Sequence, residues 1–199
     1  MRRVQRIAIG FLLLISFTAY AYAETGPQEM VKSVASQTIE RIKKDREKIK
    51  ADPLYINTLV DELILPHFDF ERMSRWVLGK YWRRATPDQQ QHFIKEFKNL
   101  LIRTYASSLL EYVDQKINYL PFRDNPGDKD VTVRSEIAQP GGFPIPITYK
   151  LYKLNDNWMV YDVLIDDVSL VANYRSSFSK EIRSKGMDAL IKTLADKNK

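Results

Sequence analysis

A change of hydrophobic period within residues 157–178 constrains the fold of this chain more than any other feature. In residues 157–165 apolar side chains occur on both faces of a period-two pattern, which is typical of a buried strand. Alternation places Tyr161 and Val163 on one face, and Val160 and Asp162 on the other. After this strand the apolar residues recur every three or four positions, as on one face of a helix: Val171, Tyr174, Phe178 and Ile182. The segment predicts a central strand that leads directly into an amphipathic helix.

Residues 1–23 have the three parts of a secretory signal peptide. The first part is a positive n-region with Arg2, Arg3 and Arg6. It is followed by an apolar run at residues 7–17 and by a small-x-small cleavage site that ends at Ala23. The apolar run is too short to span a membrane as a helix. We therefore expect cleavage after Ala23 and an exported, soluble protein in which residues 24–199 form a single domain.

The mature chain is only mildly basic. The whole sequence has 31 lysines and arginines against 25 aspartates and glutamates. Its net charge of +6 falls to about +3 without the signal peptide. This charge is too small to indicate nucleic-acid binding, although it is compatible with transient contact with an anionic membrane. The sequence has no cysteine, so an apolar core without disulfides must stabilise the fold.

The first half of the mature chain has the periodicity of helices. A narrow apolar stripe predicts one long, exposed amphipathic helix over residues 28–50, and Asp52 with Pro53 predicts the start of the next helix. Asp69 is expected to cap a short helix that ends at Gly79. The side chains of that short helix that we expect to point inward are Met73, Trp76 and Val77.

Thr86, Pro87 and Gln89 predict a capping box at the start of a helix of about 25 residues. After Tyr112 the period changes to two. Four strands separated by short turns are expected near residues 115–122, 130–138, 145–154 and 157–165. Two helices, separated near Gly186, complete the chain.

These elements predict an α+β fold with N-terminal helices, a curved four-stranded antiparallel meander and two C-terminal helices. A long helix lined with aromatic residues could enclose an apolar pocket against such a sheet. Periodicity is the same for a filled core and for a hollow one, so both arrangements stay open at this point.

The sequence has no motif typical of catalysis or metal binding. His67 and His92 have no partner at a metal-ligand spacing, so we expect the first to cap a turn and the second to face solvent. Asp166–Asp167 lacks the spaced oxygen ligands of a calcium loop, and glycine-rich phosphate loops are missing. We expect no catalytic residue, no metal and no cofactor, and predict that the protein is not an enzyme.

Six collinear segments of the mature chain match the pattern of one family. They are residues 68–70 (FDF), 77–83 (VLGKYWR), 97–105 (FKNLLIRTY), 145–149 (IPITY), 158–163 (WMVYDV) and 168–175 (VSLVANYR). In these segments the chain resembles the MlaC family of periplasmic phospholipid carriers of Gram-negative bacteria, also called the toluene-tolerance auxiliary family. One departure is Asp166–Asp167, where the family often has an acid followed by glycine, a residue that adopts positive φ more easily.

This resemblance implies a soluble, monomeric shuttle in the periplasm that carries glycerophospholipids between the outer and inner membranes and maintains outer-membrane lipid asymmetry. It implies exchange with an outer-membrane lipoprotein–porin complex and with an inner-membrane ABC transporter that has an MCE-domain subunit. The phospholipid is cargo rather than a cofactor, and its headgroup stays exposed. Contact with membranes is transient, and no nucleic acid is involved.

A phospholipid carrier needs an apolar cavity. Holding two acyl chains with roughly 30 methylenes in water costs about 25 kcal/mol. We therefore expect a cavity near the upper end of the usual range of about 300–1,000 Å³. The residues predicted to line it are Phe97, Leu101, Tyr105, Ile147, Tyr149, Leu151, Tyr161, Val163 and Tyr174.

Two other functions are compatible with the same pattern. Cone-shaped α+β folds also host isomerases and dehydratases, for which Asp162 with Tyr149 or Tyr161 is the candidate acid–base pair. A periplasmic adaptor with a filled core and no ligand is the third interpretation, and it predicts that no cavity exists.

Overall fold

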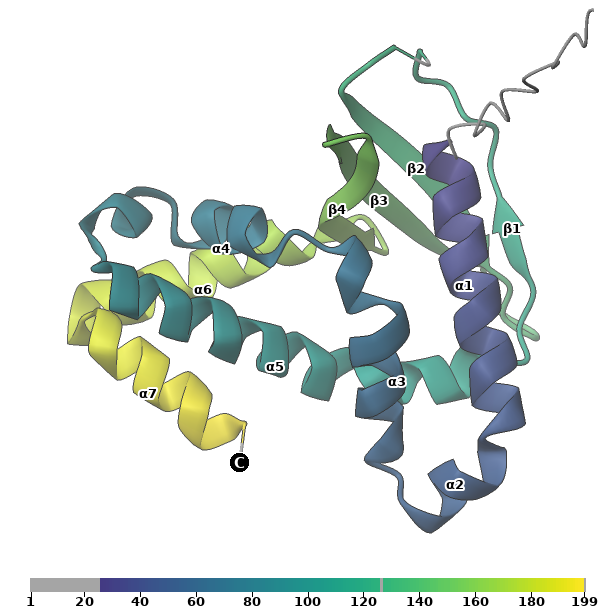
Figure 1. Cartoon of the computed structure of the whole chain (residues 1–199), viewed down its shortest axis with the longest axis horizontal. Helices are drawn as coiled ribbons and strands as arrows, with labels where there is room; N and C mark the ends of the chain where they lie inside the picture. The colour runs from purple at the N-terminus through teal and green to yellow at the C-terminus, as the bar shows by residue number, and fades with distance from the viewer. Residues whose placement is uncertain (1–25, 126, 199) are drawn as a thin grey trace, which may run out of the picture.

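The computed structural model describes residues 26–125 and 127–198, which form an α+β fold built on an antiparallel sheet (Figure 1). The strands are β1 (Ile117–Tyr119), β2 (Asp130–Ile137), β3 (Ile145–Leu154), β4 (Asn157–Ile165) and β5 (Val168–Ser169). They follow one another in the sheet in chain order, and each neighbouring pair is antiparallel. The predicted signal peptide and its cleavage site lie outside the described residues.

The α+β class and the meander are confirmed, but the sheet has five strands rather than four. The additional strand, β5, is the two-residue segment before the C-terminal helices, and it pairs with the end of β4. A strand this short has too few residues for an alternating pattern, so the sequence periodicity did not reveal it. The first strand is also shorter than predicted, with three residues.

The helices form two groups that are joined by the longest one, α5 (Pro87–Tyr112) (Figure 1). In one group α4 (Phe70–Leu78), α6 (Leu170–Lys185) and α7 (Met187–Lys197) pack with the first half of α5 around Phe93, Phe97 and Phe178. In the other group α1 (Pro27–Lys44), α2 (Arg46–Ala51) and α3 (Tyr55–Leu63) pack with the second half of α5, and α1 crosses the face of the sheet. Two 3-10 turns, η1 (Leu65–His67) and η2 (Gly79–Arg84), flank α4.

Two predicted helix starts are confirmed by their capping hydrogen bonds, and the start of α6 has a cap of the same kind. Thr86 and Gln89 form the predicted capping box of α5, and Asp69 Oδ1 accepts from the backbone N–H of Arg72 at 2.8 Å. Ser169 Oγ accepts from the N–H of Ala172 at 3.0 Å and caps α6. Gly79 has the expected positive φ of 53° where α4 ends.

The predicted helix over residues 28–50 is interrupted at Asp45, which separates α1 from α2. The Asp45 carboxylate is buried and accepts from Arg41 Nε at 2.6 Å and from the Tyr55 hydroxyl at 3.1 Å. The hydrogen bond from Arg41 lowers the pKa of Asp45 to about 2. These contacts hold Asp45 in a turn, and Tyr55 lies too far along the chain for a helical pattern to reveal its part in them.

Two predictions for the following segment were wrong. Asp52 accepts from the N–H of Leu54 at 3.0 Å and caps a turn, and α3 begins only at Tyr55. Trp76 is 45% exposed instead of pointing inward. Its ring packs on that of Tyr161 at a centroid distance of 5.2 Å.

A β-bulge in β4 changes which of its side chains share a face. Lys150 pairs with Asp162, whereas the next residue of β3, Leu151, pairs with Val160, so Tyr161 is an additional residue in β4. The bulge shifts the alternation by one position. Val160 and Val163 therefore point to the same face, and the regular alternation that places Tyr161 beside Val163 is broken.

The turn between β4 and β5 consists of Asp166 and Asp167, which have φ values of 50° and 60°. Both residues of a two-residue type I′ turn have positive φ, and glycine adopts this region without the strain that a Cβ introduces. We expect Asp167→Gly to raise the free energy of unfolding by about 0.5–1 kcal/mol, as measured by urea denaturation. Asp167→Ala, which retains the Cβ, should not stabilise the protein. Equal stabilisation by alanine would contradict this explanation.

Candidate functional site

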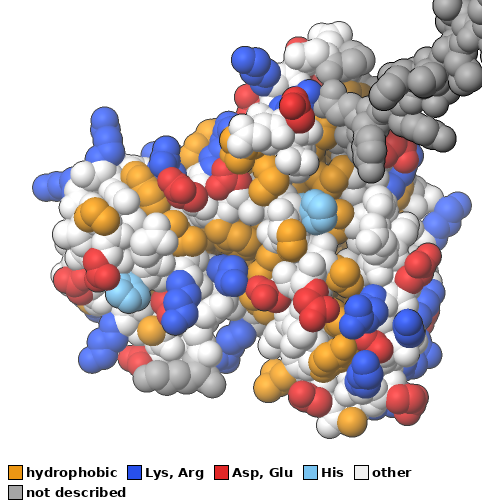
Figure 2. Space-filling view, viewed as in Figure 1, with side chains coloured by type: hydrophobic (Ala, Val, Ile, Leu, Met, Phe, Trp, Pro, Cys, Tyr) orange, Lys and Arg blue, Asp and Glu red, His pale blue; other side chains and the backbone are white. Residues whose placement is uncertain are grey.

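An apolar cavity of about 450 Å³ lies between the sheet and the helices α1, α3 and α5. Its helical wall includes residues of the second half of α5, from Leu101 to Tyr112, and one face of α1. Its sheet wall includes Ile147 and Tyr149 of β3 and Val163 of β4. Hydrophobic side chains are also visible in the hollow across the middle of the molecule, with charged side chains around it (Figure 2). A cavity of this kind is incompatible with a filled-core adaptor.

The cavity is electrically neutral. None of the described residues that line it is Asp, Glu, Lys or Arg. Burial lowers the pKa of His67 from its usual 6.5, so this lining histidine is neutral at pH 7. Burial raises the pKa of Tyr105 to about 12 and also raises that of Tyr149, so both phenols stay protonated. The site therefore favours an uncharged, apolar ligand segment.

Five of the nine residues predicted to contact lipid lie together on this cavity. They are Leu101, Tyr105, Ile147, Tyr149 and Val163. The three strand residues are positioned by the pleat: Ile147 and Tyr149 are two residues apart, and Val163 pairs with Tyr149. Contact of these side chains with a lipid stays a prediction.

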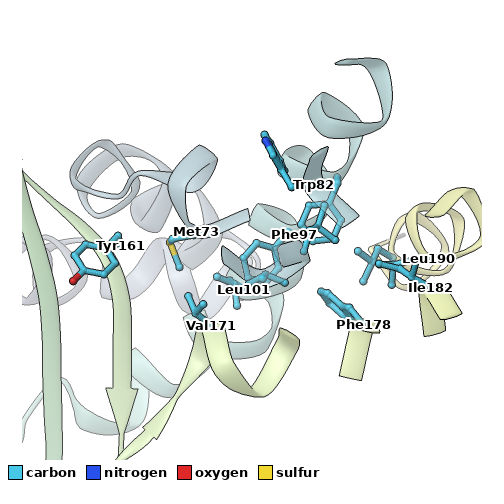
Figure 3. Packing of buried hydrophobic residues seen from close by; sticks show 13 residues of the cluster. Met73, Trp82, Phe97, Leu101, Tyr161, Val171, Phe178, Ile182 and Leu190 are labelled. Atoms are coloured by element: carbon cyan, nitrogen blue, oxygen red, sulfur yellow. The ribbon is translucent and has the colours of Figure 1, made fainter. Parts of the chain in front are cut away.

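The other four predicted residues do not line the cavity. Phe97 packs against Phe178 at a ring-centroid distance of 6.1 Å in the core between α5 and α6 (Figure 3). Its ring also packs against that of Tyr174 at 5.4 Å. Leu151 shares a face of β3 with Tyr149, but it is fully buried in the close-packed cluster around Trp158. Tyr161 is the additional residue of the bulge, and it is buried in the core cluster that includes Met73 rather than in the cavity wall.

Sequence reasoning missed the part of the cavity that α1 forms. Val34, Ala35 and Ile39 line it, together with Thr38, whose hydroxyl donates to the carbonyl of Val34 at 2.8 Å. The narrow apolar stripe of this helix was the available signal, but a stripe predicts only that something covers it. His67 was likewise expected to cap a turn, and instead it lines the cavity.

Of the two candidate acid–base pairs of the enzyme interpretation, Asp162 with Tyr149 is not assembled, and in the other pair neither Asp162 nor Tyr161 lines the cavity. Asp162 pairs with Lys150 and lies on the face of the sheet opposite to Tyr149. Its carboxylate accepts from Ser169 Oγ at 2.7 Å and from the N–H of Val171 at 3.2 Å. These bonds attach the start of α6 to β4, so Asp162 has a structural role that accounts for its burial.

Two features are absent from residues 26–125 and 127–198, the part of the chain that the structure describes. Within these ranges no group of three or more His, Cys, Asp or Glu side chains is placed to hold a metal ion. No helix in the same ranges is both long and apolar enough to cross a membrane.

Comparison with known proteins identifies the family. The sequence model of the MlaC protein family matches residues 32–196, which is most of the chain. The chain belongs to the MlaC family. It is 30% identical over 177 residues to the intermembrane phospholipid transport system binding protein MlaC of Haemophilus influenzae, covering 87% of this chain and 83% of that protein. It is 27% identical over 178 residues to the toluene tolerance protein ttg2D of Pseudomonas putida, covering 89% and 82% of the two chains.

A solved structure of similar fold contains a lipid. The phospholipid-binding protein of Ralstonia solanacearum, determined in complex with a phospholipid, superposes with a TM-score of 0.81 at 34% sequence identity. The match covers 87% of this chain and 97% of that one. The MlaC-family fold described above, cavity-forming helices included, is thus shared over nearly the whole of that phospholipid-binding chain.

Proposed function

We propose that this protein is a periplasmic carrier that binds a phospholipid by its acyl chains and transports it between membranes. The observation that carries the proposal is the uncharged cavity of about 450 Å³ in a member of the MlaC family. The relatives named for intermembrane phospholipid transport and for phospholipid binding support the same function. Export through the signal peptide, with cleavage after Ala23, would place the carrier in the periplasm.

The cavity volume sets a lower bound on the number of acyl-chain methylenes that the protein can hold. A methylene group occupies about as much room as a water molecule in the liquid, roughly 30 Å³. The cavity of about 450 Å³ therefore accommodates about 15 methylenes, or one acyl chain. This volume is smaller than the one expected for two chains. The headgroup, which the neutral lining cannot pair with, stays in water.

The absence of charge also explains how a carrier releases its cargo without an energy source. A site that holds the acyl chains by burial alone has an affinity close to that of another apolar environment, so lipid leaves when a partner offers one. We propose that the partners are an inner-membrane ABC transporter with an MCE-domain subunit and an outer-membrane lipoprotein–porin complex. Binding and transport, rather than catalysis, are the activities that this site supports.

Lipid extraction tests the proposal. The mature protein is purified from the periplasmic fraction of a Gram-negative host without detergent, denatured and extracted with organic solvent, and the extract is identified by mass spectrometry. We expect phospholipid in a near-stoichiometric ratio to protein. Protein that is folded but yields no phospholipid would refute the carrier function.

A further inference from the structure

The loop between β2 and β3, residues 138–144, exposes an aromatic side chain at its tip. Phe143 is 93% exposed, more than any other large hydrophobic residue that the structure describes, and Leu54 follows at 71%. Its neighbours Gly142 and Pro144 are exposed as well. Burial of a phenylalanine side chain is favourable, so this exposed ring would gain free energy from any apolar surface that covers it.

This loop leaves the wall of the cavity directly. Ile137, the last residue of β2, pairs with Ile145, the first residue of β3, and both line the cavity. Phe143 is only two residues before Ile145 along the chain. Whatever surface covers Phe143 therefore lies beside this end of the cavity.

The loop and the strand residues on either side of it have no charged side chain. Residues 137–149, with the sequence IAQPGGFPIPITY, contain no Asp, Glu, Lys or Arg, although charged residues make up 28% of the chain. A protein partner is usually recognised through a polar rim with hydrogen bonds around an apolar centre, and this stretch offers little of that kind. An uncharged stretch with an aromatic tip instead suits the interfacial layer of a bilayer.

At four of the seven positions of the loop, residues 138–144, the backbone offers no unpaired hydrogen-bond donor. Pro140, Pro144 and Pro146 have no N–H. The N–H of Ala138 donates to the carbonyl of Lys116 at 2.9 Å, and that of Gly142 donates to the carbonyl of Gln139 at 3.3 Å. Unpaired backbone donors are what makes irregular chain costly to place in lipid, so their scarcity lowers the cost of insertion here.

We propose that residues 138–144 insert into the interfacial layer of a phospholipid bilayer through Phe143 and bring this end of the cavity to the lipid surface. The proposal rests on the function proposed above, because it names the surface from which the cavity is loaded. The attraction is apolar rather than electrostatic. The neighbouring segments have both signs of charge, since the N–H of Ala138 donates to the carbonyl of Lys116 at 2.9 Å and the N–H of Asp166 donates to the carbonyl of Pro146 at 3.0 Å.

Uptake from vesicles tests the proposal. Wild-type mature protein, Phe143→Ala and the control Leu54→Ala are stripped of lipid, refolded and mixed with phosphatidylcholine vesicles that contain a fluorescent phospholipid. Flotation with the vesicles and the rate of fluorescent-lipid uptake are measured. We expect Phe143→Ala to reduce both by about tenfold and Leu54→Ala to leave both unchanged. We also expect the wild-type values to persist at high salt, which screens electrostatic binding.

The outcomes separate this proposal from the carrier function itself. Wild-type protein that yields no phospholipid on extraction would refute the carrier function, whatever the Phe143 result. Wild-type protein that carries lipid, with Phe143→Ala loading from vesicles at the wild-type rate, overturns the membrane proposal alone. Normal vesicle loading with a defect only when periplasmic extract is added would assign the loop to a protein partner and also overturn it. Both substitutions are at exposed positions, and circular dichroism verifies that the variants are folded.

Discussion

Replacing Ala35 by tryptophan should prevent the protein from holding phospholipid while leaving it folded. Ala35 lines the cavity from α1, and its side chain is only partly buried, so a larger side chain extends into the cavity rather than into close-packed core. An indole that takes the place of about four methylenes of an acyl chain removes about 3 kcal/mol of binding free energy. The expected result is an affinity lower by about 100-fold. Lipid per protein is measured by mass spectrometry after extraction.

The neighbouring residue provides the matched control. Ser36 is on the same helix but is exposed, so Ser36→Trp adds the same side chain outside the cavity. This control variant should retain the wild-type lipid content. Thermal unfolding of both variants shows that neither loses lipid by unfolding. If Ala35→Trp is purified with as much lipid as Ser36→Trp, the acyl chains are not in this cavity.

Replacing Asp162 by alanine should lower the free energy of unfolding by about 3 kcal/mol. The Asp162 side chain is 3% exposed and accepts from the Ser169 hydroxyl and from the N–H of Val171. Removing a buried acceptor leaves its donors without partners, and each such loss costs about 1–3 kcal/mol. The carboxylate also interacts favourably with the N-terminus of α6. Urea denaturation measures the change.

Two single substitutions measure how much individual contacts of Asp162 contribute to this loss of stability. Ser169→Ala removes the cap of α6 and one bond to Asp162, and should cost about 1 kcal/mol. Lys150→Met removes a partly exposed ion pair of 3.9 Å and should change stability by less than about 1 kcal/mol. The lipid content of folded Asp162→Ala should equal that of the wild type, because Asp162 faces away from the cavity. An Asp162→Ala variant with wild-type stability would show that this contact does not hold α6 to β4.

Much of the fold was accessible from local patterns. Thr86 with Gln89, Asp69 and Ser169 are capping residues whose side chains act within three positions along the chain, so their roles are visible in the sequence. The break at Asp45 was not visible in this way, because it depends on Tyr55, the first residue of α3.

The wall of the cavity was predictable only where the alternation is regular. Ile147 and Tyr149 lie on an uninterrupted stretch of β3, and the prediction placed them together, as the structure does. In β4 the bulge at Tyr161 shifts the alternation, so Val160 replaces Tyr161 on the cavity face. Nothing in the local pattern marks the bulge, because Tyr161 is apolar enough to be buried on either side.

The aromatic residues of α5 and α6 show a similar limit. Phe97 and Leu101 have the same apolar spacing, yet Phe97 is in close-packed core and Leu101 borders the cavity. The difference depends on what lies opposite each turn of the helix: α6 covers Phe97, whereas α1 and the sheet stand apart from the second half of α5.

By itself the sequence determined the order and type of most helices and strands, the helix caps at Thr86 and Asp69 and the resemblance to the MlaC family, because these depend on neighbouring residues or on a shared pattern. Only the tertiary structure decided how the strand and helix of residues 157–178 are oriented. The bulge turns Tyr161 away from the cavity, Asp162 binds the start of α6, and Tyr174 packs into the core. A hollow also depends on the distance between elements that are remote in the chain, which apolar periodicity does not encode.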